Sequence, residues 1–387
     1  MADDISVLIV DDSALMRNLI GRMIENTPGL VVADKAMNGK FALQKIPRAD
    51  PDVIVLDLEM PEMNGIEFLK ERKKQGIRIP VVILSSIAAR GAEITMEALA
   101  LGASDFIQKP SGSISDDIHT VKDSLTSMLL GYGGQYRRIQ GKKVAPVDHM
   151  GKPSAKIGGS SLTGTSQSQF VKSADGLVIP PHGAVKARPP LRRPGKTDII
   201  AIGISTGGPD ALRLVFSKLD ADLKTPIVVV QHMPPGFTLE FARSLDRICP
   251  LEVKEAEEGD AIRSGRALIA QGNKHLEVEK IPQGAVVHLT DAPLVSGHRP
   301  SADVLFASVA KWYGNHALGV IMTGMGRDGA EQIGEIYKEG GLTLGQDEAS
   351  AVVYGMPRVA FELGHVQEQV TLQNMARRIC DLAKTPR

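Results

Sequence analysis

Five polar residues in the first third of the chain each lie at the end of a short apolar run: Asp11, Asp12, Asp57, Ser85 and Lys109. If these runs are parallel strands, their carboxyl ends share one edge of a sheet and the five side chains converge there. Carboxylates packed so closely repel one another unless a cation neutralises them. Mg²⁺ suits such oxygen ligands where a phosphoryl group is also bound. Asp57 could then act as the nucleophile toward a phosphoryl donor, with Lys109 and Ser85 contacting the phosphoryl oxygens.

A single aspartate at the end of a strand is more often a helix cap or a solvated loop residue, but five convergent positions argue against that interpretation. Together they resemble the response-regulator receiver family over residues 3–128. The resemblance implies that Asp57 is the phosphorylation site, that Asp12 binds the metal directly and that Asp11 assists through water. It also implies that Ser85 is the switch hydroxyl, although a second serine follows it directly.

A second candidate nucleophile lies in the stretch Gly203–Gly207, which follows an apolar run and matches the pattern G-x-S-x-G around Ser205. That pattern describes a strand-to-helix turn that exposes a serine, and Pro209 suits the first turn of the helix. The backbone N–H of Thr206 and the helix start could stabilise an oxyanion. A glycine-rich turn is at least as often a phosphate cradle, but this one lacks the Walker lysine, so nucleotide binding is the weaker alternative.

His232 and Asp328 also follow apolar runs and could serve that serine. His232 comes after Ile227–Val230 and would lie at the same sheet edge as Ser205, where it could take the serine proton. Asp328 comes after Leu318–Met322 and could orient the histidine and stabilise its charge. The alternatives are a structural histidine and a helix-capping aspartate. The chain order Ser–His–Asp differs from the Ser–Asp–His order of α/β-hydrolases, so that fold is not expected.

Both groups of candidate residues need parallel strands to bring them together. The apolar pattern predicts two sets of such strands. Short apolar runs alternate with segments of helical periodicity in residues 3–130 and again in residues 197–387. This alternation predicts two α/β domains, each with a doubly wound parallel sheet and right-handed crossovers. Residues 131–196 are rich in Gly, Ser, Thr, Pro, Lys and Arg without a sustained period, so we expect a long flexible basic linker there.

The composition is that of an ordinary globular protein, with 43% hydrophobic and 23% charged residues. The 45 Lys and Arg balance 45 Asp and Glu, yet twelve of the basic residues and only two Asp lie in residues 133–196. Because that segment lacks interleaved aromatic residues and a helix-turn-helix pattern, we do not expect nucleic-acid binding. Two cysteines without a CxxC pair indicate a reducing compartment. With no signal-peptide pattern and no long apolar run, we expect a cytoplasmic protein without membrane insertion.

Five stretches of the second predicted domain form a specific combination: Gly203–Gly208, Gln231–Thr238, Ala270–His275, His298–Phe306 and Met322–Gly329. Together with the receiver pattern they resemble the chemotaxis protein-glutamate methylesterases, the CheB family. The resemblance implies Ser205 as nucleophile, His232 as general base and Asp328 as its orienting partner. It also implies that the backbone N–H of Met325 is an oxyanion donor beside that of Thr206.

The resemblance further implies a phosphorylation-activated enzyme of sensory adaptation. Such an enzyme hydrolyses glutamate methyl esters on chemoreceptors, releases methanol and also deamidates specific receptor glutamines. Its partners would be methyl-accepting chemoreceptors as substrate and a chemotaxis histidine kinase as phosphodonor, with Mg²⁺ in the receiver domain and no cofactor in the catalytic domain. The receiver would cover the catalytic edge until Asp57 is phosphorylated. The rival interpretations are a receiver-linked transcription regulator and a noncatalytic nucleotide sensor at Gly203–Gly208.

Overall fold

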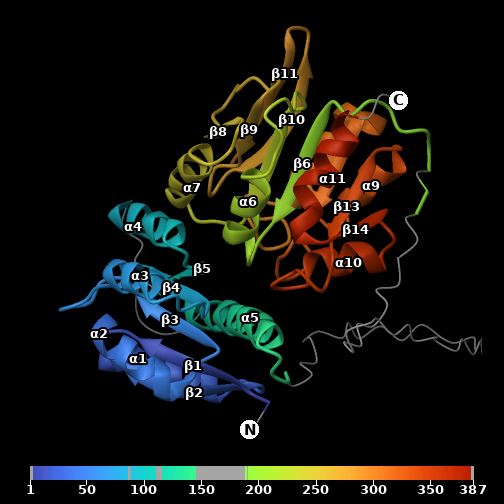
Figure 1. Ribbon diagram of the computed structural model, residues 1–387. Coiled ribbons are helices and arrows are strands. Elements are labelled where there is room, and N and C mark those ends of the chain that lie inside the picture. The colour runs from blue at the N-terminus through green and yellow to red at the C-terminus, as the bar shows by residue number, and fades with distance from the viewer. Residues whose placement is uncertain (1–2, 86–88, 110–115, 145–187, 190, 385–387) are drawn as a thin grey trace, which may run out of the picture.

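The computed structural model describes residues 3–85, 89–109, 116–144, 188–189 and 191–384, which form two α/β domains (Figure 1). Each domain is built on a parallel sheet with helices packed against it, so the predicted fold class is confirmed. Most of the predicted linker, residues 145–187, lies outside the described residues. Among the helices that are described, none combines the length and the apolar character needed to cross a membrane.

The first domain holds a five-stranded parallel sheet in the order β2-β1-β3-β4-β5 within the described residues. Its strands are β1 (Ile5–Val10), β2 (Leu30–Ala36), β3 (Val53–Asp57), β4 (Val81–Ser85) and β5 (Asp105–Gln108). Its helices are α1 (Ala14–Glu25), α2 (Gly39–Ala49), α3 (Gly65–Lys74), α4 (Ala89–Ala100) and α5 (Asp116–Ile139). Every residue of β3 and β4 is buried, as expected for strands with helices on both faces of the sheet.

The second domain holds a seven-stranded sheet in the order β14-β13-β12-β6-β7-β9-β8. Its strands are β6 (Ile199–Ile204), β7 (Ile227–Gln231), β8 (Glu252–Glu255), β9 (Arg266–Ile269), β12 (Ala317–Ile321), β13 (Leu342–Gln346) and β14 (Glu368–Val370). Its helices are α6 (Gly208–Phe216), α7 (Phe237–Asp246), α8 (Ala302–Tyr313), α9 (Ile333–Lys338), α10 (Met356–Glu362) and α11 (Leu372–Lys384), with a short 3₁₀ turn η1 (Gly314–His316). The sheet grows from β6 toward β7 on one side, and toward β12, β13 and β14 from later in the chain on the other. The carboxyl end of β6 is therefore the switch point where ligands bind in such sheets.

An antiparallel hairpin interrupts this parallel pattern. Strands β10 (His275–Ile281) and β11 (Gly284–Thr290) pair with each other and project from the second domain (Figure 1). The sequence pattern predicted only parallel strands for residues 197–387, but the apolar run Val286–Leu289 lies in this hairpin. The two-residue turn before Gly284 closes a hairpin, and a parallel connection would need a dozen residues or more.

Helix α5 runs to Ile139, beyond the expected start of the linker at residue 131. The glycines that resembled a loop lie inside this helix at points of close approach. A Cβ at Gly131 would lie 2.3 Å from the carbonyl oxygen of Val352, and one at Gly133 would lie 2.3 Å from Ile5 Cγ2. These glycines therefore let the helix touch β1 on one side and the second domain on another.

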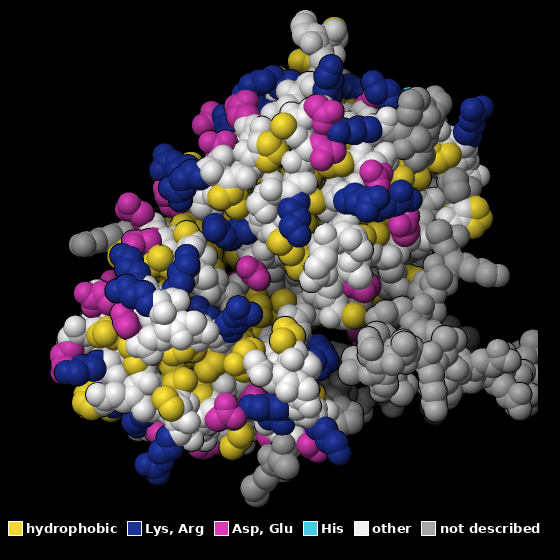
Figure 2. Space-filling model, viewed as in Figure 1, with side chains coloured by type: hydrophobic (Ala, Val, Ile, Leu, Met, Phe, Trp, Pro, Cys, Tyr) yellow, Lys and Arg dark blue, Asp and Glu magenta, His cyan; other side chains and the backbone are white. Residues whose placement is uncertain are grey.

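The two domains meet through α4, β5 and α5 of the first and the carboxyl edge of the second sheet (Figure 1). Phe106 on β5 stacks on Phe237 at the start of α7, with ring centroids 4.9 Å apart. Gln135 on α5 donates a hydrogen bond of 2.9 Å to the carbonyl oxygen of Ala351. Over the face shown in Figure 2, acidic and basic side chains are interspersed and the two domains meet along a visible seam.

Candidate active site

The turn after β6 presents Ser205 at the switch point of the second sheet. Gly208 N–H donates to the carbonyl oxygen of Ser205 over 2.7 Å, and Ser205 N–H donates to the carbonyl oxygen of Thr323 over 3.0 Å. Gly207 has φ = 81°, a conformation that glycine adopts without strain. A Cβ at Gly208 would lie 1.8 Å from Gln231 Oε1, so the tight turn also depends on that glycine. The turn therefore holds the serine at the amino end of α6.

His232 links Ser205 to Asp328. Its Nδ1 lies 3.0 Å from Ser205 Oγ, and its Nε2 lies 2.7 Å from Asp328 Oδ2. An ionised Asp328 can only accept, so Nε2 carries the proton and Nδ1 is free to accept the serine hydroxyl. Gln231 steadies the arrangement because its Nε2 donates to the carbonyl oxygens of Ser205 and His232, each over 3.1 Å. Ser205 can thus pass its proton to His232, while Asp328 holds the other side of the imidazole ring.

Asp328 is buried and held by donors from the start of α8. Ser301 Oγ donates to its Oδ1 and Ala302 N–H to its Oδ2, each over 2.6 Å. Burial alone would raise the pKa of Asp328, but the hydrogen bonds from His232, Ser301 and Ala302 outweigh it and hold the pKa below its usual value. The carboxylate therefore stays charged at neutral pH, as a partner for an imidazolium must.

Two backbone N–H groups, of Thr206 and Met325, were predicted as oxyanion donors, and both belong to loops that border Ser205. The Thr206 carbonyl accepts a hydrogen bond of 2.9 Å from Thr323 Oγ1, which ties the Thr206–Gly207 peptide to the residues that follow β12. A Cβ at Gly324 would lie 2.8 Å from Ser205 Cβ, so the loop that leads to Met325 passes directly against Ser205. The loops that carry both predicted donors therefore border Ser205.

Sequence reasoning assigned no role to His298, and the structure places it at the site. Its ring stacks on that of His232, with centroids 3.8 Å apart. Ser301, which holds Asp328, was likewise missed. Both belong to the stretch His298–Phe306. Its resemblance to a known family was the one indication in the sequence that these residues have a role. Neither follows the end of a strand, so the rule that located the other residues could not find them.

The first domain brings its three aspartates together at the carboxyl edge of its sheet. Carboxylate oxygens of Asp11, Asp12 and Asp57 lie within 4.8 Å of one another. Asp11 Oδ2 is buried without a hydrogen-bond donor, and burial raises the pKa of Asp11 although Lys109 lowers it. An under-satisfied carboxylate beside two others fits the oxygen ligands that Mg²⁺ prefers. The residues present therefore suit the predicted metal.

Lys109 and Ser85 flank this cluster. Lys109 Nζ lies 2.7 Å from Asp57 Oδ2 and 3.4 Å from Asp11 Oδ2. Burial would lower the pKa of Lys109, but these two carboxylates outweigh it and raise the pKa. Ser85 is buried at the end of β4, and its Oγ lies 2.6 Å from Thr95 Oγ1 on α4. Ser85 thus joins the strand end to α4, while the adjacent serine lies outside the described residues.

Asp105, at the other end of β5 from Lys109, reaches the nucleophile turn of the second domain. Its Oδ2 accepts a hydrogen bond of 2.7 Å from the N–H of Gly207. Burial raises the pKa of Asp105 to about 7, although the N–H groups of Gly207 and Phe106 act to lower it. One short strand therefore contacts the aspartate cluster at one end and the serine turn at the other.

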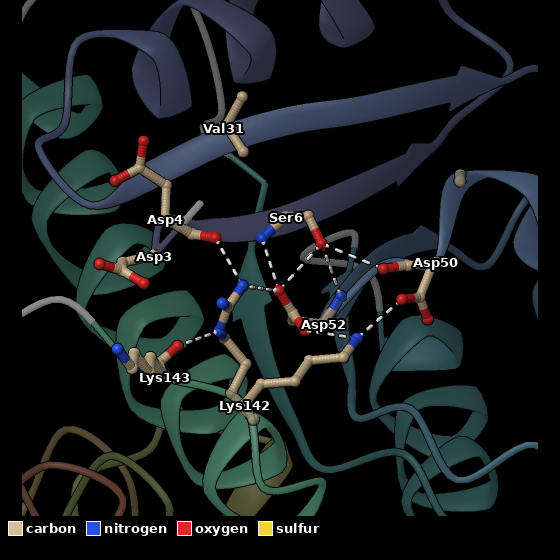
Figure 3. Close-up of a pocket in the computed structure, with 10 residues that line it drawn as sticks. Asp3, Asp4, Ser6, Val31, Asp50, Asp52, Lys142 and Lys143 are labelled. Carbon is tan, nitrogen blue, oxygen red and sulfur yellow. Dashed lines mark hydrogen bonds and ion pairs between the residues drawn. The ribbon is translucent and has the colours of Figure 1, made fainter. Parts of the chain in front are cut away.

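A hollow of about 550 Å³ lies at the opposite edge of the first sheet, away from both constellations (Figure 3). Its charged groups are already engaged with one another. Asp52 accepts hydrogen bonds from Ser6 N–H and Ser6 Oγ, each over 2.9 Å, and pairs with Arg137 Nη1 over 2.9 Å. Arg137 also donates to the Asp4 carbonyl over 2.8 Å. This network anchors the end of α5 to the sheet, and a structural role accounts for it.

Comparison with known proteins matches both domains. The sequence model of the CheB methylesterase family matches residues 200–379, and that of the response regulator receiver domain matches residues 7–120. A protein of Treponema denticola named protein-glutamate methylesterase/protein-glutamine glutaminase is 60% identical over 97% of this chain and 98% of its own length. Proteins of the same name from Treponema pallidum and Pyrococcus horikoshii are 52% and 38% identical, each over 97% of this chain and 96% and 92% of their own lengths.

Proposed function

Because the chain belongs to the CheB family of protein-glutamate methylesterase/protein-glutamine glutaminases, we propose that it hydrolyses glutamate methyl esters on methyl-accepting chemoreceptors. We further propose that it deamidates specific receptor glutamines at the same site. The observation that carries the proposal is the chain of hydrogen bonds from Ser205 through His232 to Asp328. A noncatalytic nucleotide site at the same turn would not require this relay.

The reaction proceeds in two halves. Ser205 Oγ attacks the ester carbonyl carbon while His232 Nδ1 takes the hydroxyl proton, and Asp328 stabilises the resulting imidazolium. The N–H groups of Thr206 and Met325 donate to the oxyanion. When the tetrahedral intermediate collapses, the carbon–oxygen bond to the methoxy group breaks and His232 returns the proton, so methanol leaves.

Water then completes the cycle. His232 takes a proton from the water that attacks the acyl-enzyme, and Ser205 recovers its proton as the free glutamate carboxylate is released. A glutamine side chain follows the same path, with ammonia in place of methanol as the leaving group. In this scheme the same residues act on both substrates, and water is the second reactant in each.

The first domain regulates this site in our proposal. A histidine kinase supplies the phosphoryl group, Asp57 accepts it, and Asp11, Asp12 and Asp57 would hold the Mg²⁺ that neutralises the phosphoryl oxygens. Lys109, which pairs with Asp57 over 2.7 Å, would then turn to the phosphoryl group. Since Lys109 directly follows β5, this change acts on the strand that contacts the serine turn through Asp105. Loss of that contact uncovers Ser205.

The test is methanol release from chemoreceptor membranes carrying labelled methyl esters. Wild type, Ser205→Ala and Asp57→Asn are compared with and without acetyl phosphate and Mg²⁺. We expect phosphodonor to speed release by wild type, Ser205→Ala to release none, and Asp57→Asn to keep the basal rate without stimulation. A folded wild type without Ser205-dependent release would contradict the hydrolase assignment. Stimulation that persists in Asp57→Asn would contradict the assigned phosphorylation site.

A further inference from the structure

The imidazole of His298 lies flat against the imidazole of the proposed base. The ring centroids of His232 and His298 are 3.8 Å apart and the ring planes differ by 14°. The edge of the His232 ring is engaged by Ser205 on Nδ1 and Asp328 on Nε2. Hydrogen bonds at two ring nitrogens still allow the ring to tilt about the line that joins them. A second ring stacked on one face opposes that tilt and keeps water from the face.

The segment that carries His298 is itself fixed by the chain around it. His298 and Val295 exchange backbone hydrogen bonds of 2.9 and 3.1 Å. Arg299 donates to the carbonyl oxygen of Asp291 over 2.8 Å and to Asn273 Oδ1 over 2.8 Å. These contacts make His298 a rigid platform, because neither its backbone nor the next residue is free to move with the ring.

The same segment also holds the third member of the relay. Three residues after His298, Ser301 Oγ donates to Asp328 Oδ1, and the next N–H, of Ala302, donates to Asp328 Oδ2, each over 2.6 Å. Residues 298–302 therefore contact both partners: His298 packs on the ring face of His232, and Ser301 and Ala302 bond to the carboxylate of Asp328. One continuous piece of chain thus sets the relative position of His232 and Asp328.

His298 is neutral where it lies, which suits a ring stacked on a base. Burial, and then the nearby His232, lower the pKa of His298 to about 4, although Asp328 acts to raise it. When His232 takes the proton of Ser205, its imidazolium faces the π system of a neutral ring. Such a contact attracts a cation, and a charged His298 would repel it.

We propose that His298 is a positioning residue for the reaction at Ser205. It holds the ring of His232 in the plane that joins Ser205 to Asp328 and stabilises the imidazolium that forms there. The inference rests on the proposed function, since it assumes that His232 activates Ser205. It predicts that the flat ring of His298, and not its nitrogen atoms, is what the reaction requires.

Two substitutions separate the ring from its nitrogens. His298→Phe keeps a flat aromatic ring without a titrating group, and His298→Leu fills similar space without a flat face. We expect His298→Leu to slow the reaction of Ser205 by about 10- to 100-fold, part of what proton transfer supplies. His298→Phe should stay within about 3-fold of wild type. His288→Leu is the matched control, because His288 is exposed on β11 and pairs with Glu258 over 2.7 Å.

The assay is inactivation by a small phosphonofluoridate, with full-length protein, acetyl phosphate and Mg²⁺. Ser205 Oγ bonds to phosphorus, the phosphorus–fluorine bond breaks, fluoride leaves and His232 takes the hydroxyl proton. The limiting inactivation rate and the half-saturating concentration are measured for each variant, with thermal unfolding to verify folding. We expect the loss in His298→Leu to appear in the limiting rate, with the half-saturating concentration unchanged.

Each outcome decides between specific explanations. Unaltered inactivation of His298→Leu would show that the stack has no function. Equal losses in His298→Phe and His298→Leu would show that a ring nitrogen is needed, so that His298 would be catalytic instead. A change confined to the half-saturating concentration would assign His298 to binding and overturn the positioning role. If wild type is not labelled at Ser205, the proposed function fails, and the inference fails with it.

Discussion

The hydrogen bond from Gly207 N–H to Asp105, one of those between the domains, makes the closed arrangement depend on pH. Asp105 is 2% exposed, and burial raises its pKa to about 7 despite the N–H groups of Gly207 and Phe106. The other ionisable groups that face it are Tyr132 from α5 and Asp210 from α6, and the charge of Asp210 also raises the pKa. When the domains separate, Asp105 meets water and its pKa falls toward the ordinary value of 3.8.

The direction of the pH effect depends on whether Asp105 binds its proton more tightly in the closed or in the open state. In the closed state Asp105 keeps its proton up to about pH 7, whereas in the open state Asp105 has lost its proton above about pH 4. Closure is therefore weakened as pH rises through this window and changes no further above it. The full shift is worth roughly 4 kcal/mol, and the part between about pH 5.5 and pH 8 is worth roughly 2 kcal/mol. The ratio of open to closed molecules should then rise about 30-fold.

Small-angle X-ray scattering of the unphosphorylated protein measures this ratio without relying on catalysis. Wild type should have a larger radius of gyration at about pH 8 than at about pH 5.5. Asp105→Asn keeps an oxygen acceptor for the Gly207 N–H but cannot ionise, so it should stay compact at both values. The pKa of Asp210 is also raised by burial, and any trend that Asp105→Asn retains measures that contribution.

The matched control is Glu255→Gln. Burial also raises the pKa of Glu255, but this carboxylate bonds with Thr238 inside the second domain, so the variant should follow wild type. A wild type that keeps one radius of gyration across the range, or an Asp105→Asn variant that expands as wild type does, would show that Asp105 does not control closure.

Three further substitutions test other contacts. Asp328→Asn should lower the methanol-release rate about 10⁴-fold because the amide favours the wrong histidine tautomer, as single-turnover assays would show. Arg137→Ala leaves Asp52 buried and lacking its 2.9 Å ion pair, so thermal or urea unfolding should show a loss of about 3–5 kcal/mol. Gly131→Ala puts a methyl group 2.3 Å from a carbonyl oxygen of the second domain and should raise the basal rate of methanol release, whereas Gly134→Ala, whose nearest neighbours lie at 3.8 Å, should not.

The strand ends were the most predictable feature of both domains. In a parallel sheet every carboxyl end reaches one edge, so residues that follow buried apolar runs must converge whatever the loops do. Ser205, His232 and Asp328 each follow such a run, and the structure brings them within hydrogen-bonding distance. Their order along the chain and the type of each side chain then restrict the chemistry.

Features without that periodic signal were missed. Strand β8 (Glu252–Glu255) is short and charged, and β10 (His275–Ile281) alternates apolar and charged residues around a hairpin that single runs do not reveal. The glycines of α5 were assigned to a linker because a glycine-rich composition is typical of linkers. Composition does not show that a neighbouring atom leaves no room for a Cβ at these positions. His298 lies in an irregular segment, so its stack on His232 could be seen only in three dimensions.

Two of the contacts between the domains are made by β5, the strand that leads directly to Lys109. A hydrogen bond to a neutral buried carboxyl group contributes about 0.5–1.5 kcal/mol, and the stack of Phe106 on Phe237 about 0.5–1.5 kcal/mol beyond its buried area. Asp105 and Phe106 are adjacent on β5, and Lys109 directly follows that strand, so these contacts share one rigid element with the lysine that pairs with Asp57. Phosphorylation can favour opening only by the difference in contact energy between the two states. A displacement of β5 by about 1 Å would lengthen the bond to Gly207 beyond hydrogen-bonding range. A small movement at Asp57 is therefore sufficient, in our proposal, to uncover Ser205.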